Sequence, residues 1–174
     1  MSFKLVARID RPRVHDHALG LALTKTAGFR ANPRGFFAAV VSGTRAAPVL
    51  EDVADIEVPK AFGTAQGLRF LEDECTRILQ QHRPSAVTVR EAEYGRSSSS
   101  SAMRARARVE GALLSASGRE GLNAEVLLLA TISSRLGVKK AKVFLEADDL
   151  RALDWSKVKG EGREAILAAV AVLA

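Results

Sequence analysis

The chain has 174 residues, of which 47% are hydrophobic and 26% are charged, a composition that excludes disorder along its whole length. Its 26 Lys and Arg exceed its 20 Asp and Glu, and the formal net charge of +6 favours an acidic partner. The single Cys75 excludes an intrachain disulfide, and no window is apolar enough to span a membrane, so a soluble cytoplasmic protein is expected.

The predicted elements begin after a basic segment. Residues 1 to 34 carry seven Lys and Arg against two Asp, and we expect them to form a basic arm or an added element. Residues 35 to 41, GFFAAVV, have the composition of a buried strand. After a turn, the broken alternation of residues 48 to 58 predicts one or two half-exposed hairpin strands, and thus an antiparallel meander.

A helix, a strand and a second helix follow the meander. Residues 63 to 84 place their apolar side chains on one helical face and end at a proline. Residues 85 to 91 predict a short strand, and the serine run at residues 97 to 101 predicts a loop. From about residue 100 to residue 118, alanines and a valine form the inward stripe of a helix that is rich in arginine.

The last part of the chain predicts a strand and three further segments. Residues 123 to 130, NAEVLLLA, predict a buried strand, and Thr131 or Ser133 can cap a short helix after it. Residues 146 to 162 are expected to be helical and then loop-like, and residues 163 to 174 form an apolar helix. This order predicts an α/β fold whose mixed sheet has an antiparallel β-meander followed by parallel strands, with helices on both faces.

The same order is found in the ribonuclease H-like fold, and residues 84 to 138 resemble its RuvC-like branch. They contain a strand ending in glutamate, a loop, a helix with a Gly-Ala pair, a strand and a capped short helix. The Arg90-Glu91 pair is similar to the strand end of a group of short bacterial RuvC-like proteins. The resemblance covers residues 35 to 174 and implies one ribonuclease H-like domain there.

The resemblance also implies a metal site. In the superfamily, carboxylates from the first strand, the fourth strand and the final helix bind two Mg²⁺ or Mn²⁺ ions that promote phosphodiester cleavage. By position it implies Glu91 and Glu164 as metal ligands and catalytic residues, with Glu93 supporting them. The alternative is that Glu91 and Glu93 are solvated where the strand frays, and that Glu164 is an acid stabilised by its helix dipole.

The first strand departs from the family pattern. If residues 35 to 43 form that strand, Val41, Ser42 and Gly43 stand where the family has its carboxylate. Asp10 ends an earlier apolar stretch, but its use would leave residues 35 to 58 without a place in the meander. The sequence therefore leaves open whether the chain is a Mg²⁺- or Mn²⁺-dependent nuclease or a protein that has lost its metals.

Two further basic blocks could join the N-terminal one in a positive surface. They comprise Arg96, Arg104, Arg106 and Arg108 in the first, and Arg135, Lys139, Lys140 and Lys142 in the second. The residues predicted to contact nucleic acid are Arg96, Arg104, Arg108, Lys139 and Lys140. Structured DNA or RNA is favoured because no groove-reading motif is present, whereas the alternative is that these blocks are solvated faces.

A protein-interaction module or subunit with the RuvC-like fold and no catalysis is the alternative function. The apolar helix at residues 163 to 174 could then supply a homodimer surface. His15, Asp16 and His17 have no further His or Cys nearby to complete a zinc site, so an exposed turn is expected there. Cys75 lies on the apolar face of its helix and is expected to be a buried structural thiol.

Overall fold

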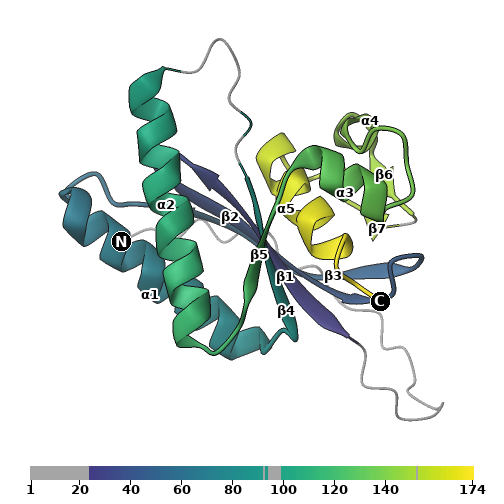
Figure 1. The fold of residues 1–174 in the computed structure, drawn as a ribbon, viewed down its shortest axis with the longest axis horizontal. Coiled ribbons are helices and arrows are strands. Elements are labelled where there is room, and N and C mark those ends of the chain that lie inside the picture. The colour runs from purple at the N-terminus through teal and green to yellow at the C-terminus, as the bar shows by residue number, and fades with distance from the viewer. Residues whose placement is uncertain (1–23, 92, 94–98, 152) are drawn as a thin grey trace.

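The computed structural model describes residues 24 to 91, 93, 99 to 151 and 153 to 174 (Figure 1). Its core is a five-stranded sheet in the order β3-β2-β1-β4-β5. The strands are β1 (Lys25–Asn32), β2 (Gly35–Gly43), β3 (Pro48–Glu57), β4 (Ala86–Arg90) and β5 (Ala124–Leu127). The first three strands pair antiparallel, whereas β4 pairs parallel with both β1 and β5. The predicted mixed sheet is therefore confirmed.

Helices cover both faces of this sheet (Figure 1). One face carries α1 (Thr64–His82) and α2 (Ser100–Arg119), and the other carries α3 (Leu129–Arg135), α4 (Lys142–Leu145) and α5 (Gly160–Val170). A small hairpin beside α4 contains β6 (Asp149–Leu150) and β7 (Leu153–Asp154). None of the described helices is long and apolar enough to cross a membrane.

The central strand β1 packs against helices on both sides. Phe29 and its alternate neighbours are buried beneath α1 and α2, while Thr26 and Gly28 face α5. The Thr26 hydroxyl donates to the Ala169 carbonyl at 2.8 Å. A Cβ on Gly28 would lie 2.1 Å from the Ala165 carbonyl oxygen, so α5 packs directly on the backbone of β1. This packing brings the start of α5 beside the end of β1.

The expectation that the sheet begins at residue 35 is wrong. Lys25–Asn32, which was assigned to the basic arm, forms β1 and lies between β2 and β4. Val41, Ser42 and Gly43 consequently belong to the second strand, not to the first. The strand lacks an apolar run because its α5 side needs small or polar residues. Residues 1 to 23, which include Asp10 and the segment from His15 to His17, lie outside the described residues.

The segment between α3 and α5 also differs from its prediction. The helix expected in the middle of residues 146 to 162 is not found among the described residues from 146 to 159, where the β6–β7 hairpin forms instead, and α5 already begins at Gly160. Arg151, with φ of 52°, turns the chain there, and the buried Trp155 donates its indole N–H to the Ala147 carbonyl at 2.9 Å. The short helix α3 begins at Leu129, so Thr131 and Ser133 lie within it and do not cap it, and Ser133 instead hydrogen-bonds to Leu129 and Ala141.

Candidate functional site

The carboxyl ends of β1 and β4 lie side by side and present two arginines to α5. Arg30 and Arg90 are register partners in the parallel pairing of these strands. Ligands of open α/β sheets commonly bind beyond the carboxyl ends of parallel strands. A functional site is therefore expected around this pair of arginines.

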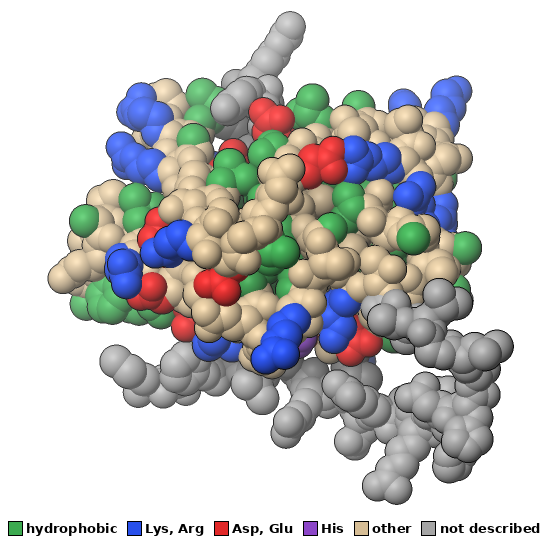
Figure 2. All heavy atoms as spheres, turned by 60° about the horizontal axis from the view of Figure 1, so that its bottom comes forward, with side chains coloured by type: hydrophobic (Ala, Val, Ile, Leu, Met, Phe, Trp, Pro, Cys, Tyr) green, Lys and Arg blue, Asp and Glu red, His purple; other side chains and the backbone are tan. Residues whose placement is uncertain are grey.

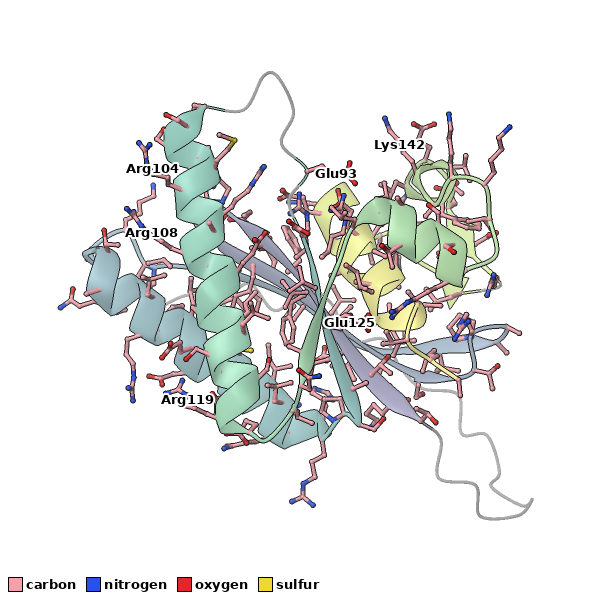
Figure 3. All side chains as sticks on the ribbon, viewed as in Figure 1. Glu93, Arg104, Arg108, Arg119, Glu125 and Lys142 are labelled. Atoms are coloured by element: carbon pink, nitrogen blue, oxygen red, sulfur yellow. The ribbon has the colours of Figure 1, made fainter. Side chains whose placement is uncertain are left out.

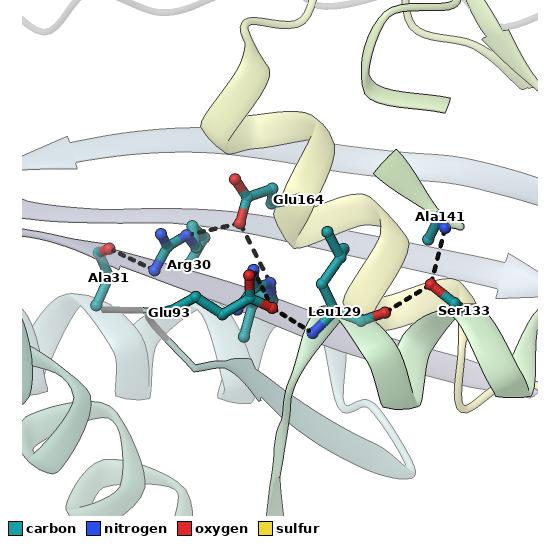
Figure 4. Close-up of polar contacts among 8 residues, drawn as sticks. Arg30, Ala31, Glu93, Leu129, Ser133, Ala141 and Glu164 are labelled. Atoms are coloured by element: carbon teal, nitrogen blue, oxygen red, sulfur yellow. Dashed lines mark hydrogen bonds and ion pairs between the residues drawn. The ribbon is translucent and has the colours of Figure 1, made fainter. Parts of the chain in front are cut away.

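Both arginines contact one carboxylate from α5. Glu164 Oε2 lies 2.9 Å from Arg30 Nε and 3.2 Å from Arg90 Nε (Figure 4). The side chains of Arg30, Arg90 and Glu164 are 8%, 4% and 18% exposed, so water screens the three charges weakly. We call these three residues the arginine cluster. It joins the central two strands to the helix that crosses them.

The arginine cluster contains more positive than negative charge. Its contacts are ion pairs without hydrogen-bond geometry, because Arg30 Nε and Glu164 Oε2 have no hydrogen-bond partner among the described residues. Arg90 Nη1 is buried and likewise finds none there. Burial lowers the pKa of the Arg90 guanidinium, whereas Glu164 opposes that decrease. A guanidinium nevertheless stays protonated in proteins, so the two cations of the cluster share its one carboxylate, and the exposed Glu93 is a further anion beside Arg90.

The predicted acids Glu91 and Glu93 both follow β4, but they differ in their contact with the arginine cluster. The Glu91 N–H donates to the Leu127 carbonyl at 3.0 Å, which continues the ladder between β4 and β5 past Arg90. Because side chains alternate along an extended chain, Glu91 is directed away from the face that holds Arg90. Glu93, in contrast, places Oε1 3.4 Å from Arg90 Nη2. Only Glu93 of this pair contacts the arginine cluster.

The residues at this site do not fit a pair of divalent metal ions. The described residues contain no group of three or more His, Cys, Asp and Glu side chains arranged to hold a metal ion. The resemblance calls for carboxylates on the first strand, the fourth strand and the final helix, and the cluster has Arg30, Arg90 and Glu164 there. Guanidinium groups have no lone pair to offer a cation. The metal-binding roles of Glu91 and Glu164 stay predictions that this arrangement does not favour.

One arginine of α2 reaches α5, the helix that carries Glu164, and it is not one of those predicted to contact nucleic acid. Arg106 Nη2 lies 3.9 Å from Glu161 Oε1 in the first turn of α5. Arg104 and Arg108 are exposed and project from the side of α2 that faces away from α5 (Figure 3). Helical spacing contained this information, since residues two apart lie on different faces. Arg96 lies outside the described residues.

A second basic group lies beyond Glu93. Lys139, Lys140 and Lys142 line an open depression of about 460 Å³, together with Glu93 and Leu129. Figure 3 shows Lys142 projecting outward from α4. The structure thus brings the predicted Lys139 and Lys140 together with the predicted Glu93, and adds Lys142.

The fold has clear counterparts among solved structures. RuvC from T. thermophilus in complex with a Holliday junction substrate superposes with a TM-score of 0.69, at 15% identity over 85% of this chain and 91% of that chain. The chain has the fold of RuvC. The yeast mitochondrial Holliday junction resolvase Ydc2 superposes with a TM-score of 0.56, at 11% identity over 85% and 77% of the two chains. No protein-family model matches the sequence, and no curated protein matches it significantly. The predicted RuvC-like fold is confirmed.

Proposed function

We propose that the protein binds structured nucleic acid through its RuvC fold and does not cleave it by a metal-dependent reaction. The observation that supports this proposal is the arginine cluster at the carboxyl ends of β1 and β4. A two-metal phosphodiester cleavage needs several anionic oxygen ligands at one place. The cluster supplies a single carboxylate, which two guanidinium groups already neutralise.

The charge of the cluster favours an anion over a cation. A divalent ion beside Glu164 would lie within a few ångströms of Arg30 and Arg90, and like charges at such distances repel strongly where water is excluded. A phosphate group would instead gain from the same two arginines and from Arg106 nearby. The site therefore suits the binding of a phosphate backbone without a bridging metal.

The fold and the basic residues support nucleic acid as the ligand. The T. thermophilus RuvC structure contains a Holliday junction substrate, which makes a four-way DNA junction the first probe to use. Lys139, Lys140 and Lys142 line a depression together with Glu93, which contacts Arg90, and these lysines could hold further phosphates. Such contacts carry no sequence information, so recognition of DNA shape is expected.

A salt titration tests this proposal. Fluorescence anisotropy of a labelled four-way junction should show binding in EDTA at low salt. The logarithm of the association constant should fall linearly with the logarithm of the salt concentration. The slope of that line should be about −0.9 for each phosphate that the protein contacts. A linear duplex with the same number of base pairs is the control and should bind more weakly. Failure to bind the junction at low salt, or binding that ignores salt, would contradict the proposal.

The alternative function is a homodimeric interaction module, and the helix suggested as its dimer surface is not available on the outside of the described structure. Ile166, Leu167 and Val170 of the apolar helix α5 are fully buried in the core of the described structure. This helix contacts β1, β2 and β4 with the side chains that a dimer interface would have used. Self-association therefore stays a prediction that needs another surface.

A further inference from the structure

We infer that the depression between Glu93 and the three lysines binds a backbone phosphate of the nucleic acid, and that the Glu93 carboxylate occupies the phosphate position in the free protein. This inference rests on the proposed function and assigns it a binding site. It also gives Glu93 a role that needs no metal ion, as a competitor of the ligand. The contacts of Glu93 carry the inference.

Glu93 is an exposed acid held loosely by two donors. Its Oε1 accepts from the Leu129 N–H at 3.3 Å and lies 3.4 Å from Arg90 Nη2 (Figure 4). Both separations are longer than the roughly 2.7 to 2.9 Å of a typical charge-assisted hydrogen bond. The Glu93 side chain is 54% exposed, so it can leave without uncovering the core. An incoming anion could take over both donors.

Arg90 remains a binding group after Glu93 leaves. Its side chain is 4% exposed and also contacts Glu164, whose Oε2 lies 3.2 Å from Arg90 Nε. Its Nη1 is buried and has no hydrogen-bond partner within the described part of the chain. A phosphate oxygen that replaced Glu93 would restore the negative charge beside Arg90 Nη2. Guanidinium groups bind phosphate with several N–H donors at once, whereas Glu93 uses one oxygen.

The three lysines form the other wall of the same depression. Lys139, Lys140 and Lys142 line it, and its volume of about 460 Å³ can admit a phosphate with part of its sugar. The loop that carries them is fixed through Ser133, whose hydroxyl donates to the Leu129 carbonyl and accepts from the Ala141 N–H, both at 2.8 Å. The lysines and Leu129 are therefore held in one frame around the site.

Substitution of Glu93 tests the inference directly. With the labelled four-way junction in EDTA, Glu93→Gln should bind about three- to tenfold more tightly than the unchanged protein, because a competing charge is gone. The matched control is Glu72→Gln, which removes the same charge from an ion pair with Arg119 at 3.0 Å on the α1 and α2 side. That control should change the affinity by less than about twofold.

A second variant tests the lysine wall independently. The double substitution Lys139→Ala with Lys140→Ala should weaken junction binding about tenfold or more, and should reduce the salt slope by about two. Its control is Lys60→Ala with Lys157→Ala, which removes two exposed lysines that do not line the depression. Melting curves followed by circular dichroism establish that each variant is folded before binding is compared.

The results separate this inference from the proposed function. If the unchanged protein binds the junction, but Glu93→Gln behaves like Glu72→Gln or binds more weakly, the inference is wrong and the proposed function stands. A lysine variant that binds like its control also overturns the inference. If the unchanged protein binds no junction at low salt, the proposed function fails, and the phosphate site fails with it.

Discussion

Among single residues, Glu164 has the largest predicted effect on stability. Its replacement by Gln would leave Arg30 buried without a neutralising charge and Arg90 with only the exposed Glu93 beside it. Breaking a buried ion pair in this way typically costs about 3 to 5 kcal/mol, and the partial exposure of Glu164 places the expected loss near the lower value. Urea denaturation of Glu164→Gln measures the change in the free energy of unfolding.

Glu161→Gln is the control for that measurement. Glu161 lies on the same helix, is 39% exposed, and is 3.9 Å from its partner Arg106. Its replacement should lower the free energy of unfolding by less than about 1 kcal/mol. Equal stability of the two variants would show that the arginine cluster contributes no more than a surface ion pair.

Cys75 reports on opening of the layer between α1 and the sheet. The thiol is fully buried, and burial raises its pKa to about 12. Because the thiolate is the reactive form, the folded protein should react with a thiol reagent at pH 8 far more slowly than the unfolded protein, whose thiol has an ordinary pKa. The rate of colour development with such a reagent, with and without urea, measures this difference. Rapid reaction in the folded protein would contradict the burial of Cys75.

The residues of the arginine cluster were hard to predict because one position decides which face a side chain occupies. The sequence suggested the right strand end and named Glu91, but the residue beside α5 is Arg90. A shift of one residue along a strand moves a side chain to the opposite face. Glu164 lies on the final helix as the resemblance implied, whereas its partner Arg30 lies in a segment that the sequence did not indicate as a strand.

At the scale of elements, β1 depends on a glycine that lets α5 approach. A Cβ at residue 28 would lie 2.1 Å from the Ala165 carbonyl oxygen and 2.6 Å from the Ala169 nitrogen. Gly28→Ala should therefore displace α5 and lower the free energy of unfolding by about 3 kcal/mol or more. It should also disturb the contact between Arg30 and Glu164. Chemical denaturation of this variant measures the loss.

Gly111→Ala provides the matched comparison for that substitution. Gly111 lies within α2, and a Cβ there would meet no described atom within 4 Å. Alanine is about 0.5 to 1 kcal/mol more favourable than glycine inside a helix, so this variant should be slightly more stable than the unchanged protein. If both alanine variants were stabilised, the close approach of α5 to β1 would be wrong.

Elements with a clear period were predictable, and those defined by tertiary contacts were not. The apolar faces of α1 and α2 and the run of β2 follow from local sequence, as does the strand β4. The strand β1 alternates buried apolar residues with Thr26, Gly28 and Arg30, whose partners come from α5. The hairpin of β6 and β7 likewise depends on the burial of Trp155.

At the scale of the whole molecule, the positive charge is distributed unevenly. Seen with the bottom of Figure 1 brought forward, the surface intersperses acidic and basic side chains (Figure 2). The lysines of the depression lie instead near α3 and α4, on the same side as Glu93 (Figure 3). The local gathering of lysines beside Glu93, more than the net charge of +6 itself, would therefore attract an anionic ligand.

The most direct test of the central claim follows the integrity of bound DNA. A labelled four-way junction is saturated with the protein in EDTA and in Mn²⁺, and its strands are then separated on a denaturing gel. We predict that the junction is bound in EDTA and that its strands remain intact in both conditions. Strands cut in Mn²⁺ but not in EDTA, with cleavage lost in Glu91→Gln, would contradict the account and establish a metal-dependent nuclease.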